Sequence, residues 1–405
     1  MKIIPLEIEN ELAAKTILAN IGTSKEGAAI LSPKCIHAAF KIEGVTSWGA
    51  NVIKQHMLSL GSDAAIERAA LVKNIVTTAV VFGNISQLQK LCEKLSSQPF
   101  GLREVSEKLS SCLCALYKKT LIFRARNKTI SVPRPLVCGI INVTPDSFSG
   151  DGLLNARFSG RSYETMVLER ARDMIRAGAR MIDVGAESSR PGAASLSAAE
   201  ELRRVVPALK IIRKEYKKII LSIDTYKLKV AQAAVDCGID VINDITALRA
   251  SPRIASLIKK HHLGCVMMHM KGSPKTMQIH PHYKHVVEDI MDFFGERLAF
   301  AQHQGIACEQ ILLDPGIGFG KTTADNLTII NQLYKFKIFG RPLMLGLSRK
   351  SFIGKVLDVD VDKRLAGSLA ANTVSLLRGA NILRVHDVKE TIQVVQIVSA
   401  ITQQQ

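Results

Sequence analysis

Residues 136–143 read LVCGIINV, an apolar run that ends on Asn142 and gives way to the polar stretch TPDSFS at 144–149. Short runs rich in Val and Ile, without polar alternation, are typical of parallel strands that are buried on both faces. An amide at the end of such a strand needs a partner, because an unpaired buried polar group costs about 1–3 kcal/mol. The run therefore predicts a buried parallel strand with a polar site at its carboxyl end.

The same pattern recurs along the rest of the chain, each run being followed by a polar break and an amphipathic stretch such as SYETMVLERARDMIRAGA at 162–179. The further runs are ARMIDVGA (179–186), IILSIDT (219–225), IDVINDI (239–245), LGCVMMH (263–269), EQILLDP (309–315), PLMLGLS (342–348) and NILRVHD (381–387). Eight strand–helix units in about 270 residues predict an α/β fold of the closed (β/α)₈ TIM-barrel type. An open doubly wound sheet is the alternative, but it usually carries a Gly-rich fingerprint after its first strand, and none is present.

The first 120 residues follow a different pattern and predict a small α+β domain of unassigned role. Strands are expected at KIIPLEIEN (2–10) and KNIVTTAVVF (73–82), and helices at 46–61, 86–96 and 102–119. The segment TLIFRARNKTISV (120–132) reads as a hairpin. We therefore expect a domain at 1–120, a hairpin or linker at 121–133 that caps the bottom of the barrel, and the barrel itself at 134–405.

Composition limits the class of protein. The chain has 405 residues, 47% of them apolar, and no apolar run of the roughly 20 residues that a membrane helix needs. Its start, MKIIPLEIENEL, carries three acids where a signal peptide needs positive charge, which predicts a cytoplasmic protein and no membrane partner. The eight cysteines are scattered, so reduced and mostly buried thiols are expected rather than disulfides or a zinc site.

The net charge of +18 suggests an anionic ligand or a nucleic acid. Residues 1–132 hold 17 basic and 10 acidic residues and the remainder holds 37 and 26, so the excess is spread thinly along the chain. Aromatic residues make up 5% of the chain, which leaves little surface for stacking bases. We therefore expect small anionic substrates and no nucleic acid.

Polar residues stand at the end of every predicted strand. A single one is most simply a helix cap, but the catalytic groups of such barrels lie where strands end, and eight such ends predict a polar ligand. The residues at these ends are Asn142, Asp183, Glu187, Asp224, Asn243, His269, Asp314, Ser348, Arg349, Lys350, Arg384 and His386.

Two groups can be separated by their chemistry. Asp224, Asn243 and Asp314, with Lys350 as a donor, suit a flat heterocycle with an amino-amide edge, such as a pterin or guanine. A cationic and hydroxyl-rich group suits a phosphate or pyrophosphate, bridged by Mg²⁺ through the Asn142 oxygen. This second group consists of Asn142, Ser188, Ser189, Arg190, Arg384 and His386.

These residues carry a family resemblance. Eight motifs follow in order those of the dihydropteroate synthases, folate-pathway enzymes that join a pterin pyrophosphate to p-aminobenzoate; the resemblance covers roughly residues 134–402. The motifs are NVTPDSFS, GAESSRPGA, SIDTY, INDI, MHMKG, LDPGIGFGK, GLSRKSFIG and RVHD. The resemblance implies a (β/α)₈ barrel, Mg²⁺ as cofactor, sulfonamides as inhibitors and a homodimer.

The resemblance also implies a role for individual residues. For the pterin it implies Asp224, Asn243, Met268, Asp314, Phe319, Gly346, Lys350 and Arg384. For the pyrophosphate it implies Asn142, Ser189, Arg190, Arg384 and His386, with Asn142 as the metal ligand. For p-aminobenzoate it implies Pro145, Phe148, Arg190, Pro191, Lys350 and Ser351. Asp224, Asp314, Lys350, Arg384 and His386 are the residues expected to carry catalysis.

Two departures from the family pattern concern the first two loops of the barrel. Ser189 stands where the family usually has Thr, which keeps the hydroxyl, and SFSGDGL replaces the usual SFSDGG, which leaves the role of Asp151 open. Two other functions are considered. A pterin-dependent methyltransferase barrel would have no use for the pyrophosphate group of residues, and a non-catalytic pterin-binding protein would be expected to lose Lys350 or the first loop.

Overall fold

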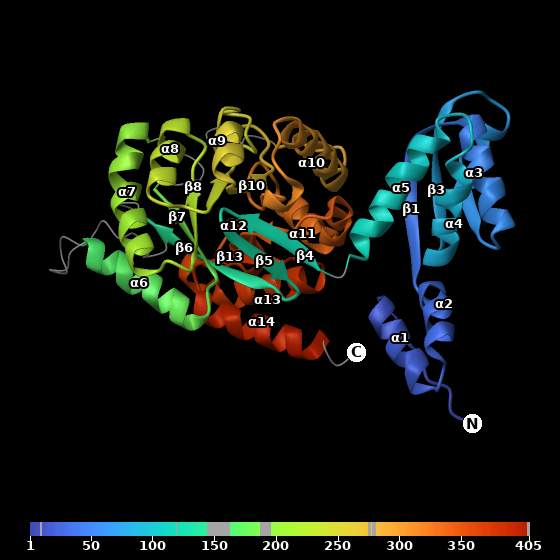
Figure 1. Cartoon of the computed structure of the whole chain (residues 1–405), viewed down its shortest axis with the longest axis horizontal. Coiled ribbons are helices and arrows are strands. Elements are labelled where there is room, and N and C mark those ends of the chain that lie inside the picture. The colour runs from blue at the N-terminus through green and yellow to red at the C-terminus, as the bar shows by residue number, and fades with distance from the viewer. Residues whose placement is uncertain are drawn as a thin grey trace. The chain divides into compact units, whose positions relative to one another are not determined.

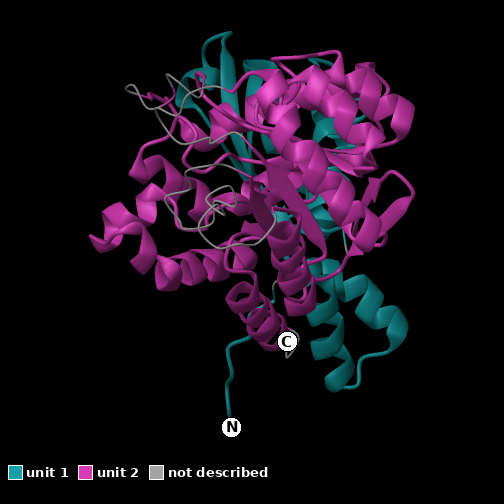
Figure 2. Ribbon diagram, turned by 90° about the vertical axis from the view of Figure 1, so that its left-hand side faces the viewer, with its two compact units in different colours: residues 1–118, 405 teal, residues 119–404 magenta. Residues whose placement is uncertain are grey.

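A computed structural model describes residues 1–8, 10–118, 120–143, 163–186, 196–273, 277 and 281–402 (Figure 1). The chain divides into two compact units, of which the first covers residues 1–118 and the second residues 119–404 (Figure 2). No helix among the described residues is both long enough and apolar enough to cross a membrane.

The first unit is an α+β domain, as predicted. Its elements are α1 (Glu11–Asn20), α2 (Lys25–Cys35), β1 (His37–Thr46), α3 (Ser47–Ser59), β2 (Asp63–Ile66), β3 (Val76–Asn84), α4 (Ile85–Leu95) and α5 (Leu102–Leu116). The three strands form an antiparallel sheet in the order β1-β3-β2. Alternate β3 residues such as Ala79 and Val81 are buried with Ile53 of α3 and Leu88 of α4.

The strand predicted at residues 2–10 is wrong. Residues 2–8 form no strand, and Ile3, Ile4 and Leu6 are exposed. Pro5 has no N–H to donate to a sheet, and the described strand β1 pairs only with β3. The Ile-rich pattern of this segment therefore has no neighbouring strand to stabilise it.

The second unit contains the predicted barrel, and the (β/α)₈ fold is confirmed. Its strands are β6 (Leu136–Asn142), β7 (Met181–Gly185), β8 (Ile220–Asp224), β9 (Val241–Asp244), β10 (Gly264–Met268), β11 (Ile311–Asp314), β12 (Met344–Leu345) and β13 (Ile382–Val385). They pair in parallel in the order β11-β10-β9-β8-β7-β6-β13-β12. A parallel bridge between Leu313 and Leu343 joins the two ends of this sheet.

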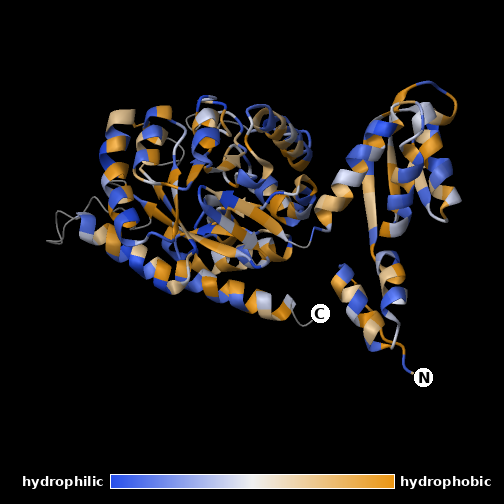
Figure 3. Ribbon diagram, in the orientation of Figure 1, coloured by the Kyte–Doolittle hydropathy of each residue, from blue (hydrophilic) through white to orange (hydrophobic). Residues whose placement is uncertain are grey.

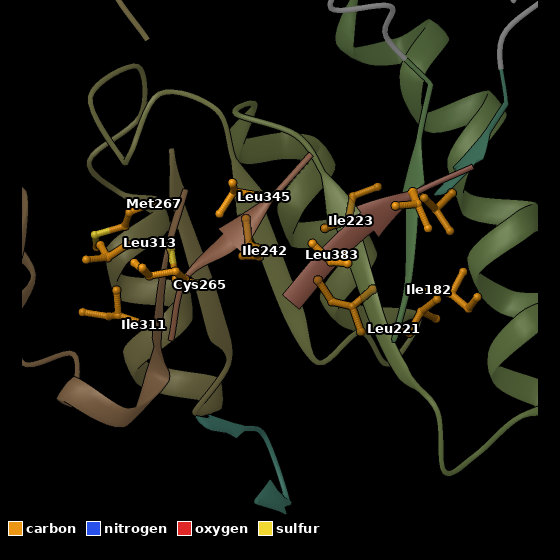
Figure 4. Close-up of a cluster of buried hydrophobic side chains, with 14 of the residues drawn as sticks. Ile182, Leu221, Ile223, Ile242, Cys265, Met267, Ile311, Leu313, Leu345 and Leu383 are labelled. Carbon is orange, nitrogen blue, oxygen red and sulfur yellow. The ribbon is translucent and has the colours of Figure 1, made fainter. Parts of the chain in front are cut away.

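Helices cover the outer face of the barrel. They are α6 (Tyr163–Ala177), α7 (Ala198–Glu215), α8 (Leu228–Asp236), α9 (Ile254–His261), α10 (Val286–His303), α11 (Thr323–Asn331), α12 (Ser351–Leu357), α13 (Leu365–Leu377) and α14 (Val388–Thr402). Every second residue of each strand packs outward, mostly in the large core cluster that also contains helix residues (Figure 4). Examples are Ile182, Leu221, Leu313 and Leu383. Figure 3 shows the strands as mostly hydrophobic and the helices as mixed, in keeping with helices that bury one face only.

The residues between them point into the barrel, because successive side chains of a strand alternate in direction. The lowest inward layer is apolar and is closed by the hairpin of β4 (Leu121–Ala125) and β5 (Lys128–Val132), whose Phe123 and Val132 join its cluster. The layer consists of Cys138, Met181, Ile220, Val241, Val266, Leu312, Met344 and Ile382. Gly264 makes room for the hairpin, since a Cβ there would lie 2.5 Å from Phe123 Cζ.

Candidate active site

The inward layers become polar toward the carboxyl ends of the strands. Two residues beyond the apolar layer lie Ile140, Asp183, Ser222, Asn243, Met268, Asp314, Gly346 and Arg384. Two residues further on, Asn142, Asp224, Ser348 and His386 follow on four of the strands. The alternation that builds the apolar core thus brings most of the predicted site residues to one end of the barrel, which we call the mouth.

Arg384 joins three strands across the mouth. Its Nε donates to Asp183 Oδ2 at 2.6 Å and its Nη2 donates to Asp224 Oδ2 at 2.7 Å. Asn243 Nδ2 also donates to Asp183 Oδ2, at 3.0 Å. The Asp183 side chain is 1% exposed, whereas those of Asp224 and Arg384 are each 20% exposed. The outer carboxylate, Asp224, is therefore the one within reach of a ligand.

Burial raises the pKa of Asp224 to about 7; Arg384 opposes this rise and the negative charge of Asp183 adds to it. A carboxyl group with this pKa changes charge near neutral pH. Such perturbed carboxyl groups are concentrated at functional sites, where a ligand can select one charge state.

Asp314 and Lys350 are two further charged groups of the mouth, and the charge of each acts on the other. Asp314 Oδ1 accepts the Gly316 N–H at 2.7 Å, and Lys350 donates to the Ile317 carbonyl and lies 4.8 Å from the centre of the Phe319 ring. Burial raises the pKa of Asp314 and lowers that of Lys350 to about 8, and in each case the partner's charge opposes the shift. Lys350 is thus close to a change of charge at neutral pH.

An apolar cluster lies beside these charges. Met268 and Phe319, two of the residues predicted for the pterin, belong to it, and Tyr226 packs against it. Its members are Ile245, Met268, Met270, Met277 and Phe319. A Cβ at Gly346 would lie 3.9 Å from both Lys350 Nζ and Arg384 Cβ, at ordinary contact distance, so the glycine leaves room beside these residues. An apolar wall with a few charged groups is typical of sites that bind a flat ring.

His386 lies two residues after Arg384 and is held by neighbouring strand ends. Its Nδ1 lies 3.1 Å from Ser348 Oγ, and its Nε2 lies 3.5 Å from Asn142 Nδ2. His386 N also donates to Ser348 Oγ at 3.3 Å. This arrangement brings Asn142 and His386, both predicted for the pyrophosphate, into contact.

His269 and Arg349, two of the predicted strand ends, are not inward residues of the mouth. His269 Nδ1 lies 2.9 Å from Lys321 Nζ, and its ring packs edge-on against Phe293 at 4.8 Å. Burial, followed by the charge of Lys321, lowers the pKa of His269 to about 2. Arg349 instead makes a bidentate pair with Asp387, at 2.6 and 3.0 Å.

Sequence reasoning missed Lys321 and assigned no role to Asp183. Lys321 is 3% exposed and donates to the carbonyls of Phe319 (3.0 Å) and His269 (3.3 Å). Burial lowers the pKa of Lys321 well below its usual value. Its place directly after the glycines of GIGFGK was the available signal, because a lysine beside a tight loop often binds the carbonyls of that loop.

Several predicted residues lie outside the described part of the chain. They are Pro145, Phe148, Ser189, Arg190 and Pro191, together with Asp151, Glu187 and Ser188. The roles expected for the first two loops of the barrel therefore stay predictions. Ser351, also predicted for p-aminobenzoate, is described and begins α12 directly after Lys350.

Comparison with known proteins places the chain in a family. Residues 138–386 match the profile of the family described as pterin binding enzyme. Dihydropteroate synthase of Escherichia coli K12 is 42% identical over 276 residues, which cover 68% of this chain and 95% of that protein. The chain belongs to the dihydropteroate synthase family.

A Synechocystis dihydropteroate synthase is 40% identical to this chain over 269 residues, which cover 66% of this chain and 90% of the relative. A Halobacterium salinarum protein, named a probable bifunctional folylpolyglutamate synthase/dihydropteroate synthase, is 33% identical over 393 residues, covering 96% of this chain and 46% of the relative. That alignment therefore includes most of the first unit.

Solved structures agree with the sequence matches. The Yersinia pestis dihydropteroate synthase in complex with a sulfonamide drug superposes with a TM-score of 0.66 at 41% identity, covering 70% of this chain and all of that one. The Xanthomonas albilineans dihydropteroate synthase with 4-aminobenzoic acid gives a TM-score of 0.64 at 36% identity, covering 70% and 98%. The barrel of this synthase-family chain thus corresponds to nearly the whole of each of these proteins.

Proposed function

We propose that this chain is a dihydropteroate synthase, which condenses 6-hydroxymethyl-7,8-dihydropterin pyrophosphate with p-aminobenzoate to give 7,8-dihydropteroate and pyrophosphate in folate biosynthesis. The observation that carries the proposal is the convergence of Asp224, Asp314, Lys350 and Arg384 at one barrel mouth. Family membership favours this transferase reaction over a methyltransferase barrel and over a non-catalytic pterin-binding protein.

Pterin recognition is assigned to the acidic side of the mouth. Asp224 and Asp314 would accept N–H bonds from the amino-amide edge of the heterocycle, Asn243 would add amide contacts, and Lys350 would donate to the ring. Buried carboxylates are strong acceptors, since a charged hydrogen bond is about twice as strong as a neutral one. Met268 and Phe319 would form the apolar wall, Gly346 would leave room for the ring, and Arg384 would lie against its face.

The leaving pyrophosphate is assigned to the basic side of the mouth. Arg384 and His386 would stabilise the charge that develops on it, together with Ser189 and Arg190. No group of three or more His, Cys, Asp or Glu side chains in the described part of the chain is placed to hold a metal ion. The single amide oxygen of Asn142 fits Mg²⁺ nonetheless, because this ion keeps several waters and takes phosphate oxygens as ligands. When bound, Mg²⁺ would neutralise the developing charge of the pyrophosphate.

The reaction forms a bond between the amine nitrogen of p-aminobenzoate and the pterin methylene carbon. The bond from that carbon to the pyrophosphate oxygen breaks, its electron pair leaves with pyrophosphate, and the amine proton passes to water. The neutral aromatic amine is a weak nucleophile, which favours a dissociative path in which the leaving group departs first. The carboxylates Asp224 and Asp314 would then stabilise the positive charge on the pterin.

Recognition of p-aminobenzoate is assigned to residues around the start of α12. Lys350 and Ser351 would bind it there, and Pro145, Phe148, Arg190 and Pro191 would complete its site. A sulfonamide would compete for the same place, which makes the chain a proposed sulfonamide target. A cytoplasmic homodimer is part of the proposal as well.

The direct test mixes the purified protein with the pterin pyrophosphate and p-aminobenzoate, with and without Mg²⁺, and follows dihydropteroate and pyrophosphate separately. We expect the two products in equal amounts, dependence on Mg²⁺, and inhibition by a sulfonamide that is competitive with p-aminobenzoate. Binding of the pterin substrate without any product would contradict the proposed activity and would support a non-catalytic binding protein.

A further inference from the structure

Asp183 is the acidic residue of the mouth to which the proposed reaction gives no substrate contact. Its side chain is 1% exposed, and its Oδ2 accepts from both Arg384 Nε and Asn243 Nδ2. Its Oδ1 is buried and has no hydrogen-bond partner among the described residues. A buried carboxylate oxygen without a donor is unfavourable, so packing alone does not account for an acid at this position.

The other half of the Arg384 guanidinium lies where the heterocycle is proposed to bind. Its Nη2 donates to Asp224 Oδ2 at 2.7 Å, so the guanidinium and the proposed ligand share this carboxylate. A pterin that pairs with both carboxylate oxygens of Asp224 through its amino-amide edge displaces Nη2 from Oδ2. The bond from Nε to Asp183 is made by a different nitrogen and can persist through that change.

We propose that Asp183 is a positioning residue that anchors Arg384 through Nε, so that the guanidinium exchanges Asp224 for the pterin pyrophosphate without leaving the mouth. The inference rests on the proposed function, because that function supplies the pterin pyrophosphate, the ligand for which Arg384 Nη2 leaves Asp224. A cation shared between two carboxylates is held less firmly by each than by a single partner. The charge of Asp183 thus keeps Arg384 from pairing exclusively with Asp224.

The neighbouring residues are consistent with this exchange. Gly185, the next inward residue of β7 after Asp183, faces Asp224, and a Cβ there would lie 3.3 Å from Asp224 Cβ. A side chain at Gly185 would crowd Asp224, so the glycine allows the outer carboxylate to pack closely against β7. Asn243 Nδ2 donates to the same Asp183 oxygen as Arg384 Nε, which fixes the anchor while Asp224 stays partly exposed.

The test compares Asp183→Asn with a matched control, Asp240→Asn. Asp240 is also a buried carboxylate with cationic partners, accepting from Lys128 at 2.6 Å and Arg213 at 2.5 Å, but it precedes β9 and thus lies at the amino ends of the strands. Calorimetry gives the Kd of the pterin pyrophosphate, steady-state rates give the KM of each substrate, and circular dichroism gives Tm.

We expect Asp183→Asn to raise the Kd and KM of the pterin pyrophosphate roughly tenfold, because Arg384 then pairs with Asp224 alone. The KM of p-aminobenzoate should not change. The acid limb of the pH profile of kcat/KM should move to lower pH, since the Asp183 charge that raises the pKa of Asp224 is gone. Asp240→Asn should lower Tm and leave both KM values and the pH profile unchanged.

Two results would overturn the proposal. One is an Asp183→Asn variant whose Kd for the pterin pyrophosphate and whose acid limb of the kcat/KM pH profile match those of the wild type. The other is an Asp183→Asn variant that, like the control, has a lower Tm but unchanged Kd and KM values. Should Asp183→Asn not fold, Asp183→Glu keeps the charge and changes its reach, and an unchanged pterin Kd in that variant would count against the anchor. A wild type that binds the pterin pyrophosphate without forming product contradicts the proposed function only, because the calorimetric comparison needs no turnover.

Discussion

One guanidinium, that of Arg384, connects the ends of three barrel strands. It donates to Asp183 of β7 and Asp224 of β8, and it projects from β13. Removing one partner from a buried ionic network leaves an uncompensated charge, so single substitutions in such networks are strongly destabilising. The chemistry of the mouth therefore depends on individual charges rather than on the general polarity of the rim.

Asp224→Asn tests the charge that faces the ligand. Asp224 must be ionised to accept N–H bonds from the heterocycle, and its pKa is raised to about 7, chiefly by burial, so wild-type kcat/KM should fall as pH drops below about 7. The amide variant should lose about 10²-fold in kcat/KM for the pterin substrate and lack this acid limb. Steady-state kinetics from pH 5.5 to 8.5, with Tm as a check on folding, measures both. A near-normal rate in a folded variant would refute the electrostatic role.

His269 allows a prediction about acid stability. Its pKa is about 2 in the folded chain, because burial and then Lys321 disfavour the cation, against an ordinary value of 6.5. Below pH 6.5 the unfolded chain therefore binds a proton that the folded chain does not, and stability is lost by about 1.4 kcal/mol per pH unit.

His269→Asn should remove this contribution, since its side-chain oxygen can replace Nδ1 as the acceptor for Lys321. Urea unfolding at several values between pH 4 and 6.5 measures the slope of the free energy of unfolding against pH. The control is His303→Asn at the exposed end of α10, which should leave the slope as in the wild type. Equal slopes in both variants would show that His269 does not contribute to acid unfolding.

At the scale of elements, the loop between β11 and α11 is held by several hydrogen bonds. Lys321 binds two of the surrounding carbonyls, Tyr283 Oη donates to Gly320 O at 2.7 Å, and Asn326 Oδ1 accepts the Gly318 N–H at 2.8 Å. The loop presents the Ile317 carbonyl to Lys350 and carries Phe319. Its conformation thus determines where two of the proposed pterin-binding residues lie.

Gly316→Ala should be strongly destabilising. Gly316 has φ of +68°, and a Cβ there would lie 2.0 Å from the His269 carbonyl oxygen, a backbone atom that cannot rotate away. Gly238→Ala is the matched control, with φ of +84° and a nearest contact of 3.3 Å to the flexible Arg213 side chain. Backbone strain is common to both variants and is worth about 1 kcal/mol, so any larger loss in Gly316→Ala reports the clash. Equal Tm values for the two would contradict the close packing.

The barrel elements were predictable from sequence because their signal is local. Each strand is a short apolar run, and its alternation decides that Asp183, Asn243 and Arg384 point inward while Ile182 and Leu383 point outward. The bridge that Arg384 makes between Asp183 and Asp224 was not predictable, since it depends on distances between residues that are 160 and 201 positions apart.

Elements of the first unit were predicted less well. Helices α1 and α2 were missed although Asn10 and Ser24 cap their first turns, because their apolar residues do not form a regular stripe and Pro33 stands inside α2. The strand expected at residues 2–10 has a suitable composition but no neighbouring strand to pair with. Strand formation depends on such tertiary partners more than helix formation does.

At the scale of the whole molecule, every described residue of the mouth belongs to the second unit. The Escherichia coli relative aligns over 95% of its own length with 276 residues of this chain, so a dihydropteroate synthase of that size has no room for a counterpart of the first unit. The Halobacterium relative does align with most of the first unit, within a protein of about twice this length. The first unit is therefore shared by the Halobacterium relative and is not a general requirement of the family.

These comparisons predict that a fragment of residues 119–405 keeps the kcat and both KM values of the full chain. The apolar floor of its barrel is closed by Phe123 and Val132, which lie inside the fragment, so the barrel core stays complete. Steady-state kinetics and thermal unfolding of the fragment, measured beside the full chain, provide the check. A fragment that unfolds at the temperature of the full-length barrel but turns over much more slowly would give the first unit a part in catalysis. Retained kinetics would confine its role to something other than the reaction.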